Sequence, residues 1–267
     1  MPTLHLAILS VVQGVTEFLP VPSSAHLVLA PRLLGWPDQG LTIDLAVQVG
    51  TLCAVCLYLH REIWEMLVGL TRVARGRRDR GAKLAFLLIV ATLPVIAAGV
   101  AVLRYMPAGL HSLALIGWAT LGFGILLYLA DGIGMTLRRL EHLDVSDAVI
   151  VGLAQVLALI PGASRAGVTM TAARLLGMER VDAARFSLLM SIPTLVAAGA
   201  LKGLELWKAG DAQLTAAALV AVGLSCLAAL IAIALMMAWL RRASFTSFVV
   251  YRIVLGVFLL GVGYGVI

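Results

Sequence analysis

The sequence predicts an all-α integral membrane protein with about six transmembrane helices and two re-entrant helix-turn-helix segments, arranged as an inverted-topology repeat. Three observations lead to this fold class. The chain of 267 residues is 61% hydrophobic and only 13% charged, with a mean hydropathy of +1.03, which is far above the values of globular domains. Six stretches are long and apolar enough to cross a bilayer. Two further hydrophobic stretches are interrupted by prolines and charged side chains, and each is a partial copy of the other.

The six predicted spans satisfy the length that a membrane crossing requires. A helix needs about 20 mostly apolar residues to cross about 30 Å of hydrocarbon. The stretches that qualify are 41–60, 84–104, 110–130, 183–203, 214–240 and 247–267. The net charge of +6 does not indicate a nucleic-acid partner, because the basic residues gather in short loops beside the spans, at 61–83, 138–139 and 241–242. The positive-inside rule predicts that these loops are cytoplasmic, which leaves both termini outside.

The order of segments predicts a duplicated architecture. Gln13 to His26 is echoed by Gln155 to Thr169, and the tetrapeptide Arg-Leu-Leu-Gly ends at Gly35 and again at Gly177. The spacing between these glycines equals the spacing between the starts of the first and fourth spans. Chance recurrence in a leucine-rich chain is the alternative, but the matched polar residues favour a repeat. The two halves are 1–142 and 143–267, in one membrane domain. Each has one broken segment and three spans, so the second half is inverted.

Prolines explain why each half begins with a broken segment. Pro20 and Pro22 lie two residues apart, and Pro161 precedes a glycine, so helical hydrogen bonds are lost at both places. Backbone freed in this way survives at membrane depth only when it is buried in protein or lines a wet cavity. We therefore expect two short helices around a polar turn in each half, with both turns near the midplane.

The first broken segment carries candidate metal ligands and a candidate nucleophile. Gln13 and Glu17 are four residues apart on one helix face, and a carboxylate at membrane depth needs a cation. We interpret both as oxygen ligands of a divalent cation, Mg²⁺ or Ca²⁺; a helix-stabilising Glu17 is the alternative. Ser23 and Ser24 begin a new helix, where free N–H groups bind phosphate. His26 follows Ser23 by three residues, so it can act as the base for a serine nucleophile.

The second broken segment supplies positive charge. Arg165 lies in an apolar setting, where a guanidinium needs a bidentate anionic partner such as a phosphate. The alternative is an ion pair with Glu17 that holds the fold together. Ser164 and Thr169 add hydroxyl groups for substrate binding. These residues together suit a substrate with two phosphates, one held and the other transferred.

The positions of Gln48, Arg252 and Trp118 inside the spans predict how their side chains point. Gln48 shares a face with Asp44 in the first span, and we expect both to point inward, with Gln48 contacting substrate. Arg252 lies near a cytoplasmic end, so we expect its side chain to extend to the interface; a role in the site is the alternative. Trp118 lies within a span and is expected to be packed.

The two polar stretches carry a family resemblance. Gln13 to His26, with Pro161 to Thr169, resembles the bacterial undecaprenyl-pyrophosphate phosphatase family, which is known also for bacitracin resistance. The likeness runs over nearly the whole chain and includes Gln48 to Thr51 and Phe248 to Arg252. Gln13 stands where many members of that family have a glutamate.

The resemblance implies an enzyme of the bacterial cytoplasmic (inner) membrane, multi-pass, with an active site that opens to the extracytoplasmic side. Its reaction would hydrolyse undecaprenyl pyrophosphate to undecaprenyl phosphate and inorganic phosphate, which recycles the carrier lipid of cell-wall peptidoglycan synthesis. By position, Gln13 and Glu17 would be associated with the metal, Ser23 would be the nucleophile, and His26 the acid or base. Arg165 would bind phosphate. The expected partners are the polyprenyl pyrophosphate substrate and membrane lipids.

Several alternatives stay open at this point. Ser23 could form a phosphoserine, or a metal-activated water could attack with His26 as its base. A transporter or flippase of the phosphorylated lipid would use the same inverted repeat. A lipid phosphatase with Pro-Ser-Gly-His motifs is less compatible, since no histidine follows Ser164 at the required place. The oligomeric state is also open, with a homodimer as one option.

Overall fold

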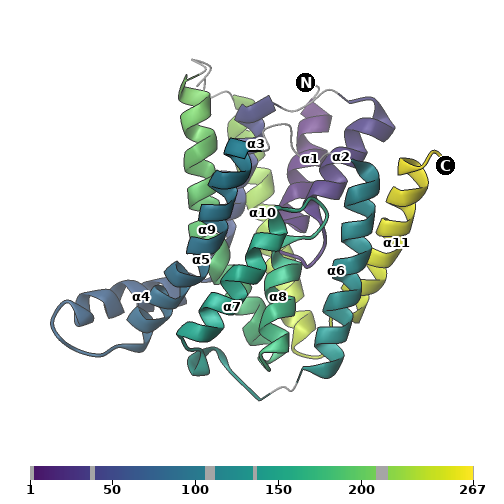
Figure 1. The fold of residues 1–267 in the computed structure, drawn as a ribbon. Helices are drawn as coiled ribbons and strands as arrows, with labels where there is room; N and C mark the ends of the chain where they lie inside the picture. Colours follow the sequence, from purple (N-terminus) through teal and green to yellow (C-terminus); the bar gives the residue numbers. More distant parts are fainter. Residues whose placement is uncertain (1–2, 37–39, 106–111, 135–136, 209–215, 267) are drawn as a thin grey trace.

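The computed structural model describes residues 3–36, 40–105, 112–134, 137–208 and 216–266, and these residues are helical without a β-strand (Figure 1). Residues 110–111, 214–215 and 267, at the ends of three predicted spans, lie outside the described residues. The α-helices are α1 Thr3–Thr16, α2 Ser23–Leu34, α3 Gly40–Tyr58, α4 His60–Val73, α5 Arg80–Tyr105, α6 Leu113–Ile133, α7 Val145–Val156, α8 Arg165–Leu175, α9 Arg180–Lys208, α10 Ala216–Leu240 and α11 Thr246–Gly263. Two short 3₁₀ turns, η1 Leu140–His142 and η2 Leu157–Leu159, complete them.

Six helices match the predicted spans in order: α3, α5, α6, α9, α10 and α11. Among the described residues, five of them are long and apolar enough to cross a membrane alone. The sixth candidate is α3, which passes the same test together with α4 as a pair bent by 78°. The prediction of an all-helical, multi-pass membrane protein is therefore confirmed.

The segment between the first two spans is more ordered than the sequence interpretation assumed. The sequence predicts a basic loop over residues 61–83, whereas His60–Val73 forms α4, which extends away from the helix bundle (Figure 1). Ile63, Met66 and Gly69 recur every three positions, and Met66 and Gly69 are buried, while charged residues such as Arg61 and Glu65 lie between or beside them. That spacing gives an amphipathic helix, whose Met66 is buried while Trp64 is 68% exposed.

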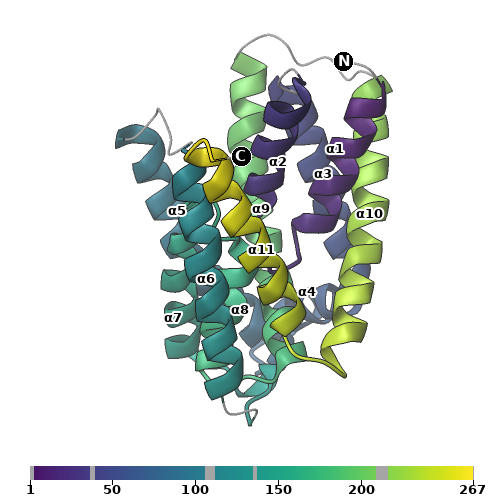
Figure 2. The same ribbon diagram turned by 90° about the vertical axis from the view of Figure 1, so that its right-hand side faces the viewer.

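Two helical hairpins enter the bundle from opposite ends. In Figures 1 and 2, α1 runs from one end to mid-height and α2 returns beside it. From the other end, α7 rises to mid-height and α8 returns. We call residues 17–22 the first turn and residues 160–164 the second turn. Gly162 has φ +94° in the second turn, and a side chain there would collide with the backbone carbonyl of Ile116, so only glycine fits.

The core forms around α9, which packs against α3, α5 and α8. Phe186 and Met190 of α9 are fully buried in one cluster with Phe18 of the first turn and Met170 of α8. The core therefore fixes both turns from one side.

Trp118 is not packed inside the protein, contrary to the expectation from its position within a span. It is 58% exposed, and its Nε1 donates to Tyr264 Oη at 3.2 Å. An amphipathic indole satisfies its N–H in this way while its ring faces outward.

Small residues bring α1 and α3 close to α10. A Cβ at Gly14 would lie 2.6 Å from the carbonyl oxygen of Ser225, and a Cβ at Gly50 would overlap the Ser225 side chain. Such glycines allow helix backbones to approach closely in membrane proteins. Because Gly14 is flanked by Gln13, this contact also sets where the polar face of α1 points.

Candidate functional site

The two turns lie against each other, as the sequence predicts. The Gly162 N–H of the second turn donates to Ser24 Oγ at the start of α2, at 3.1 Å. Arg165, at the start of α8, places Nη2 3.5 Å from Glu17 Oε1 in the first turn. Residues that are more than 130 positions apart in the chain therefore meet at mid-height of the bundle.

Arg252 of α11 joins the two turns, which corrects the expectation that it extends to the interface. Its side chain is fully buried. The guanidinium donates to Pro20 O at 3.3 Å, and to Gly162 O and Ala163 O at 3.2 and 3.0 Å. Its Nε donates to Thr120 O of α6 at 3.1 Å. The broken helices leave carbonyl groups that need donors at this depth, and a guanidinium offers five N–H groups in a fixed plane.

Glu17 is the centre of the charged cluster. Gln13 Nε2 donates to Glu17 Oε2 at 3.0 Å, while Arg165 contacts the other carboxylate oxygen. The Arg165 guanidinium also donates to Ser187 O at 3.4 Å and lies 5.9 Å from the centre of the Phe18 ring. The Glu17 and Arg165 side chains are only 15% and 12% exposed. The ion pair that was the alternative role for Arg165 is thus present, but as one long contact that leaves guanidinium N–H groups for an anion.

These residues line a cavity of about 290 Å³ between α1, α2, α3 and α9. Gln13, Glu17, Gln48 and Arg165 all lie on its wall. Asp44 and Lys202 line it too and form a second ion pair, with Lys202 Nζ 3.4 Å from Asp44 Oδ2. Ligand pockets range from about 300 to 1,000 Å³, so this cavity suits a polar headgroup and not a long hydrocarbon chain.

Lys202 is a site residue that the sequence reasoning missed. The predicted fourth span ends at 203, so Lys202 was not expected inside the bundle, whereas α9 continues to Lys208. Thr194, Ala198 and Lys202 follow one another every four residues and all line the cavity. That helical spacing is a signal in the sequence which could have identified the lysine.

Ser23 and His26 have surroundings that differ from the expected nucleophile and base. No hydrogen bond joins them in the described part of the chain, and neither lines the cavity. The His26 ring stacks on Tyr251 of α11, its Nε2 lies 2.5 Å from Tyr251 Oη, and its Nδ1 lies 2.8 Å from Pro22 O. Tyr251 was not singled out from the sequence, because only the tertiary fold brings α11 beside α2. Ser23 is half-buried as the first residue of α2.

The remaining predicted hydroxyl groups hold the turns. Ser164 caps α8 by accepting from the Gly167 N–H at 3.2 Å, with φ +67°, a strained value for a residue with a side chain. Thr169 is 1% exposed, and its hydroxyl bonds Arg165 O at 2.9 Å and Ser187 Oγ at 2.7 Å. Neither residue lines the cavity. Their hydrogen bonds are made to the first turn of α8, and they therefore position the backbone that carries Arg165.

The oxygen atoms around the cavity fit a divalent cation that is shared with a substrate. Gln13 Oε1 is buried and has no hydrogen-bond partner, and Glu17 lies beside it. No group of three or more His, Cys, Asp or Glu suited to a metal occurs among the described residues. Mg²⁺ usually takes only one or two protein carboxylates together with water and substrate phosphates. A cation held by Glu17, Gln13 and a bound phosphate therefore suits this donor set.

Replacing Arg252 by lysine should destabilise the protein. An ammonium group cannot reach the carbonyls of both turns and of Thr120 together, and each buried carbonyl left without a donor costs about 1–3 kcal/mol. We expect a lower midpoint of thermal unfolding in detergent for Arg252→Lys. Arg104→Lys, at an exposed position near the end of α5, is the control and should unfold like the wild type. Equal midpoints for both variants would contradict the role of Arg252.

The chain is similar to known proteins over nearly its whole length. The family described as "Bacitracin resistance protein BacA" matches residues 6–258. "Undecaprenyl-diphosphatase 1" of Rhodospirillum rubrum is 48% identical over 268 residues, covering 98% of this chain and 95% of the relative. "Undecaprenyl-diphosphatase" of Jannaschia sp. is 50% identical over 97% of this chain and 98% of the relative. That of Roseobacter denitrificans is 48% identical over 99% of this chain and all of the relative. The chain therefore belongs to the bacitracin resistance protein BacA family.

Proposed function

We propose that this protein hydrolyses undecaprenyl pyrophosphate to undecaprenyl phosphate and inorganic phosphate. The observation that carries the proposal is the cavity where the two turns meet, in which Arg165 and Lys202 face Glu17, Gln13 and Gln48. Two cations at one small polar cavity are suited to a headgroup with two phosphates. Relatives that are about half identical over nearly their full length carry the name undecaprenyl-diphosphatase. Those names favour hydrolysis over transport of the lipid.

Substrate binding would exchange the partners of the charged residues. An incoming phosphate offers Arg165 a bidentate partner, which is stronger than its single 3.5 Å contact with Glu17. Glu17 is then free to act with Gln13 Oε1 as a ligand of a divalent cation, Mg²⁺ or Ca²⁺. A bound cation would supply charge neutralisation on the phosphate oxygens. Lys202 can leave Asp44 in the same way and take the second phosphate.

Hydrolysis requires a nucleophile that attacks the terminal phosphorus while its bond to the bridging oxygen breaks. The electron pair of that bond leaves with the lipid monophosphate, and Arg165 offsets the developing charge. Ser23 is the proposed nucleophile, at a helix N-terminus whose free N–H groups favour phosphate. His26 would accept the serine proton after its Nε2 releases Tyr251 Oη, and water would then cleave the phosphoserine. Direct attack by water is the competing route.

We infer that the two hairpins are re-entrant segments of an inverted repeat with halves 1–142 and 143–267. The packing supports this proposal, because α1 packs against α10 while α7 packs against α5. The first helix of each hairpin thus contacts the second span of the other half, and the two third spans, α6 and α11, pack together. A pseudo-two-fold axis between the halves produces such reciprocal contacts, in which each contact from the first half to the second is matched by an equivalent contact from the second half to the first.

The orientation follows from the basic residues. The segments that carry them, 74–79 after α4, 137–142 before α7 and 241–245 after α10, lie at the end of the bundle opposite the start of α1 (Figure 1). By the positive-inside rule that end is cytoplasmic. The first hairpin and the Lys202 end of the cavity then face the extracytoplasmic side of the bacterial inner membrane. A lipid pyrophosphate on that side of the membrane could enter the cavity directly.

Phosphate release tests the function directly. The purified protein in detergent micelles should release orthophosphate from undecaprenyl pyrophosphate, and Arg165→Lys should lower kcat/KM at least about 100-fold, because lysine cannot hold a phosphate bidentately. Arg104→Lys is the matched control and should keep wild-type activity. A well-folded wild-type protein that releases no phosphate would overturn the hydrolase and favour a carrier.

Replacement of Ser23 distinguishes the two routes of attack. If Ser23 forms a phosphoserine, Ser23→Ala should lose at least about 1,000-fold in kcat. Ser24→Ala loses only the hydrogen bond from the Gly162 N–H and should lose about tenfold. Steady-state phosphate release measures both variants. Near wild-type turnover of Ser23→Ala would eliminate the covalent route and leave attack by water.

Changes at Gln13 test the proposed cation. Gln13→Glu adds a carboxylate beside Glu17, so the Mg²⁺ concentration for half-maximal activity should fall by about tenfold, whereas Gln13→Leu should raise it. Activity is titrated with Mg²⁺ after treatment with EDTA. Full activity in EDTA, or the same Mg²⁺ requirement in both variants, would contradict a cation at this site.

A further inference from the structure

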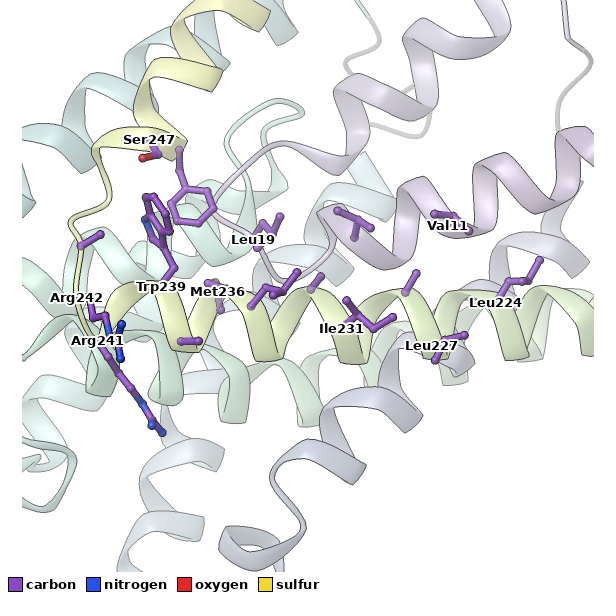
Figure 3. Close-up of a pocket in the computed structure, with 17 residues that line it drawn as sticks. Val11, Leu19, Leu224, Leu227, Ile231, Met236, Trp239, Arg241, Arg242 and Ser247 are labelled. Carbon is purple, nitrogen blue, oxygen red and sulfur yellow. The ribbon is translucent and has the colours of Figure 1, made fainter.

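A long apolar groove lies outside the catalytic cavity. It has a volume of about 1,170 Å³ and runs along α10 between α1 and the start of α11 (Figure 3). Leu224, Leu227, Ile231 and Leu235 of α10 form one wall, and Val15 of α1 contributes to the other. None of the residues that line this groove lines the catalytic cavity.

Two arginines mark one end of the groove. Arg241 and Arg242 directly follow α10, and they are the charged residues among the described residues that line the groove. Figure 3 shows both beyond Trp239, at the opposite end from Val11 and Leu224. Both are exposed, and neither forms an ion pair with an acidic residue in the described part of the chain. The groove therefore joins an apolar channel to positive charge that the protein itself does not neutralise.

The dimensions of the groove suit the tails of a lipid. From Leu224 to its end at Leu240, α10 rises about 24 Å at about 1.5 Å per residue. An acyl chain can lie along this wall with its headgroup at the arginines. A guanidinium pair binds a phosphate well, and basic residues just beyond a membrane helix attract anionic lipids.

We propose that the groove binds an anionic phospholipid, with its phosphate at Arg241 and Arg242 and its acyl chains along α10. The lipid comes from the leaflet on the basic side, which the proposed orientation makes cytoplasmic; binding itself does not depend on that orientation. The polyprenyl substrate does not suit this groove, because its headgroup belongs in the cavity of Arg165, which is lined by other residues.

The bound lipid would support the catalytic helix from behind. Val11, Val15 and Leu19 line the groove, whereas Gln13 and Glu17 of the same segment line the catalytic cavity. Acyl chains that fill the groove therefore pack against the back of α1 and of the first turn. Dispersion contacts across that surface would restrict how far the helix can move away from α10.

Lipid binding to the purified full-length protein can be measured by native mass spectrometry. Phosphatidylglycerol and phosphatidylcholine, added at equal concentrations, serve as the anionic and zwitterionic probes. We expect preferential retention of phosphatidylglycerol and about tenfold weaker retention for Arg241→Gln/Arg242→Gln. The control Arg77→Gln/Arg78→Gln removes the same charge from the exposed segment after α4 and should bind like the wild type. Equal losses in both double variants, or equal retention of the two lipids by the wild type, would overturn the proposal.

A second pair of variants tests whether the groove itself holds the chains. Ile231 and Leu219 are both exposed on α10, at 51% and 60%, but only Ile231 lines the groove. Ile231→Trp should fill the groove and weaken phosphatidylglycerol binding, whereas Leu219→Trp should not. Wild-type binding by Ile231→Trp, or displacement of phosphatidylglycerol by an equal concentration of undecaprenyl phosphate, would count against the proposed occupant.

Discussion

The structure depends on satisfying backbone groups that two broken helices expose inside the bundle. Pro20 and Gly162 mark the breaks, and the Arg252 guanidinium binds the carbonyl oxygens of both. Because Arg252 is fully buried without an acidic partner in the described chain, its charge is balanced by carbonyl dipoles that would otherwise lack donors. One side chain of α11 thus fixes the relative position of two hairpins that belong to different halves of the sequence.

The same arrangement creates the site. With the turns fixed, Glu17 and Arg165 form an ion pair where the two turns meet. Asp44 and Lys202 form a second ion pair at the same cavity. Arg165 and Lys202 each pair with a carboxylate, which avoids the large cost of an unpaired charge for the buried Arg165. The contacts are long, at 3.5 and 3.4 Å, so a phosphate can replace the carboxylates without breaking a strong bidentate pair.

The segment from α1 through the first turn lines two separate surfaces, a polar cavity and an apolar groove. Gln13 and Glu17 line the cavity that also contains Arg165, while Val11 and Val15 line the apolar groove. Gly14, between them, allows the backbone to approach Ser225 of α10. Helical periodicity makes this possible, because residues two apart in a helix point to different sides. The groove and the cavity therefore lie on opposite sides of the segment that carries Gln13 and Glu17.

The sequence by itself determined the helical membrane class, the six long apolar segments and the two proline-broken stretches, because these depend on local hydrophobicity and on the chemistry of proline. It also singled out Glu17, Gln13, Gln48 and Arg165, which line one cavity, because charged and amide side chains are costly at that depth without polar partners. Only the tertiary structure placed Arg252 at the turns and Tyr251 against His26, because α11 lies more than 200 residues from α2 in the chain. It also showed that α4 is a helix and that Lys202 reaches the cavity, because packing decides where helices bend and end.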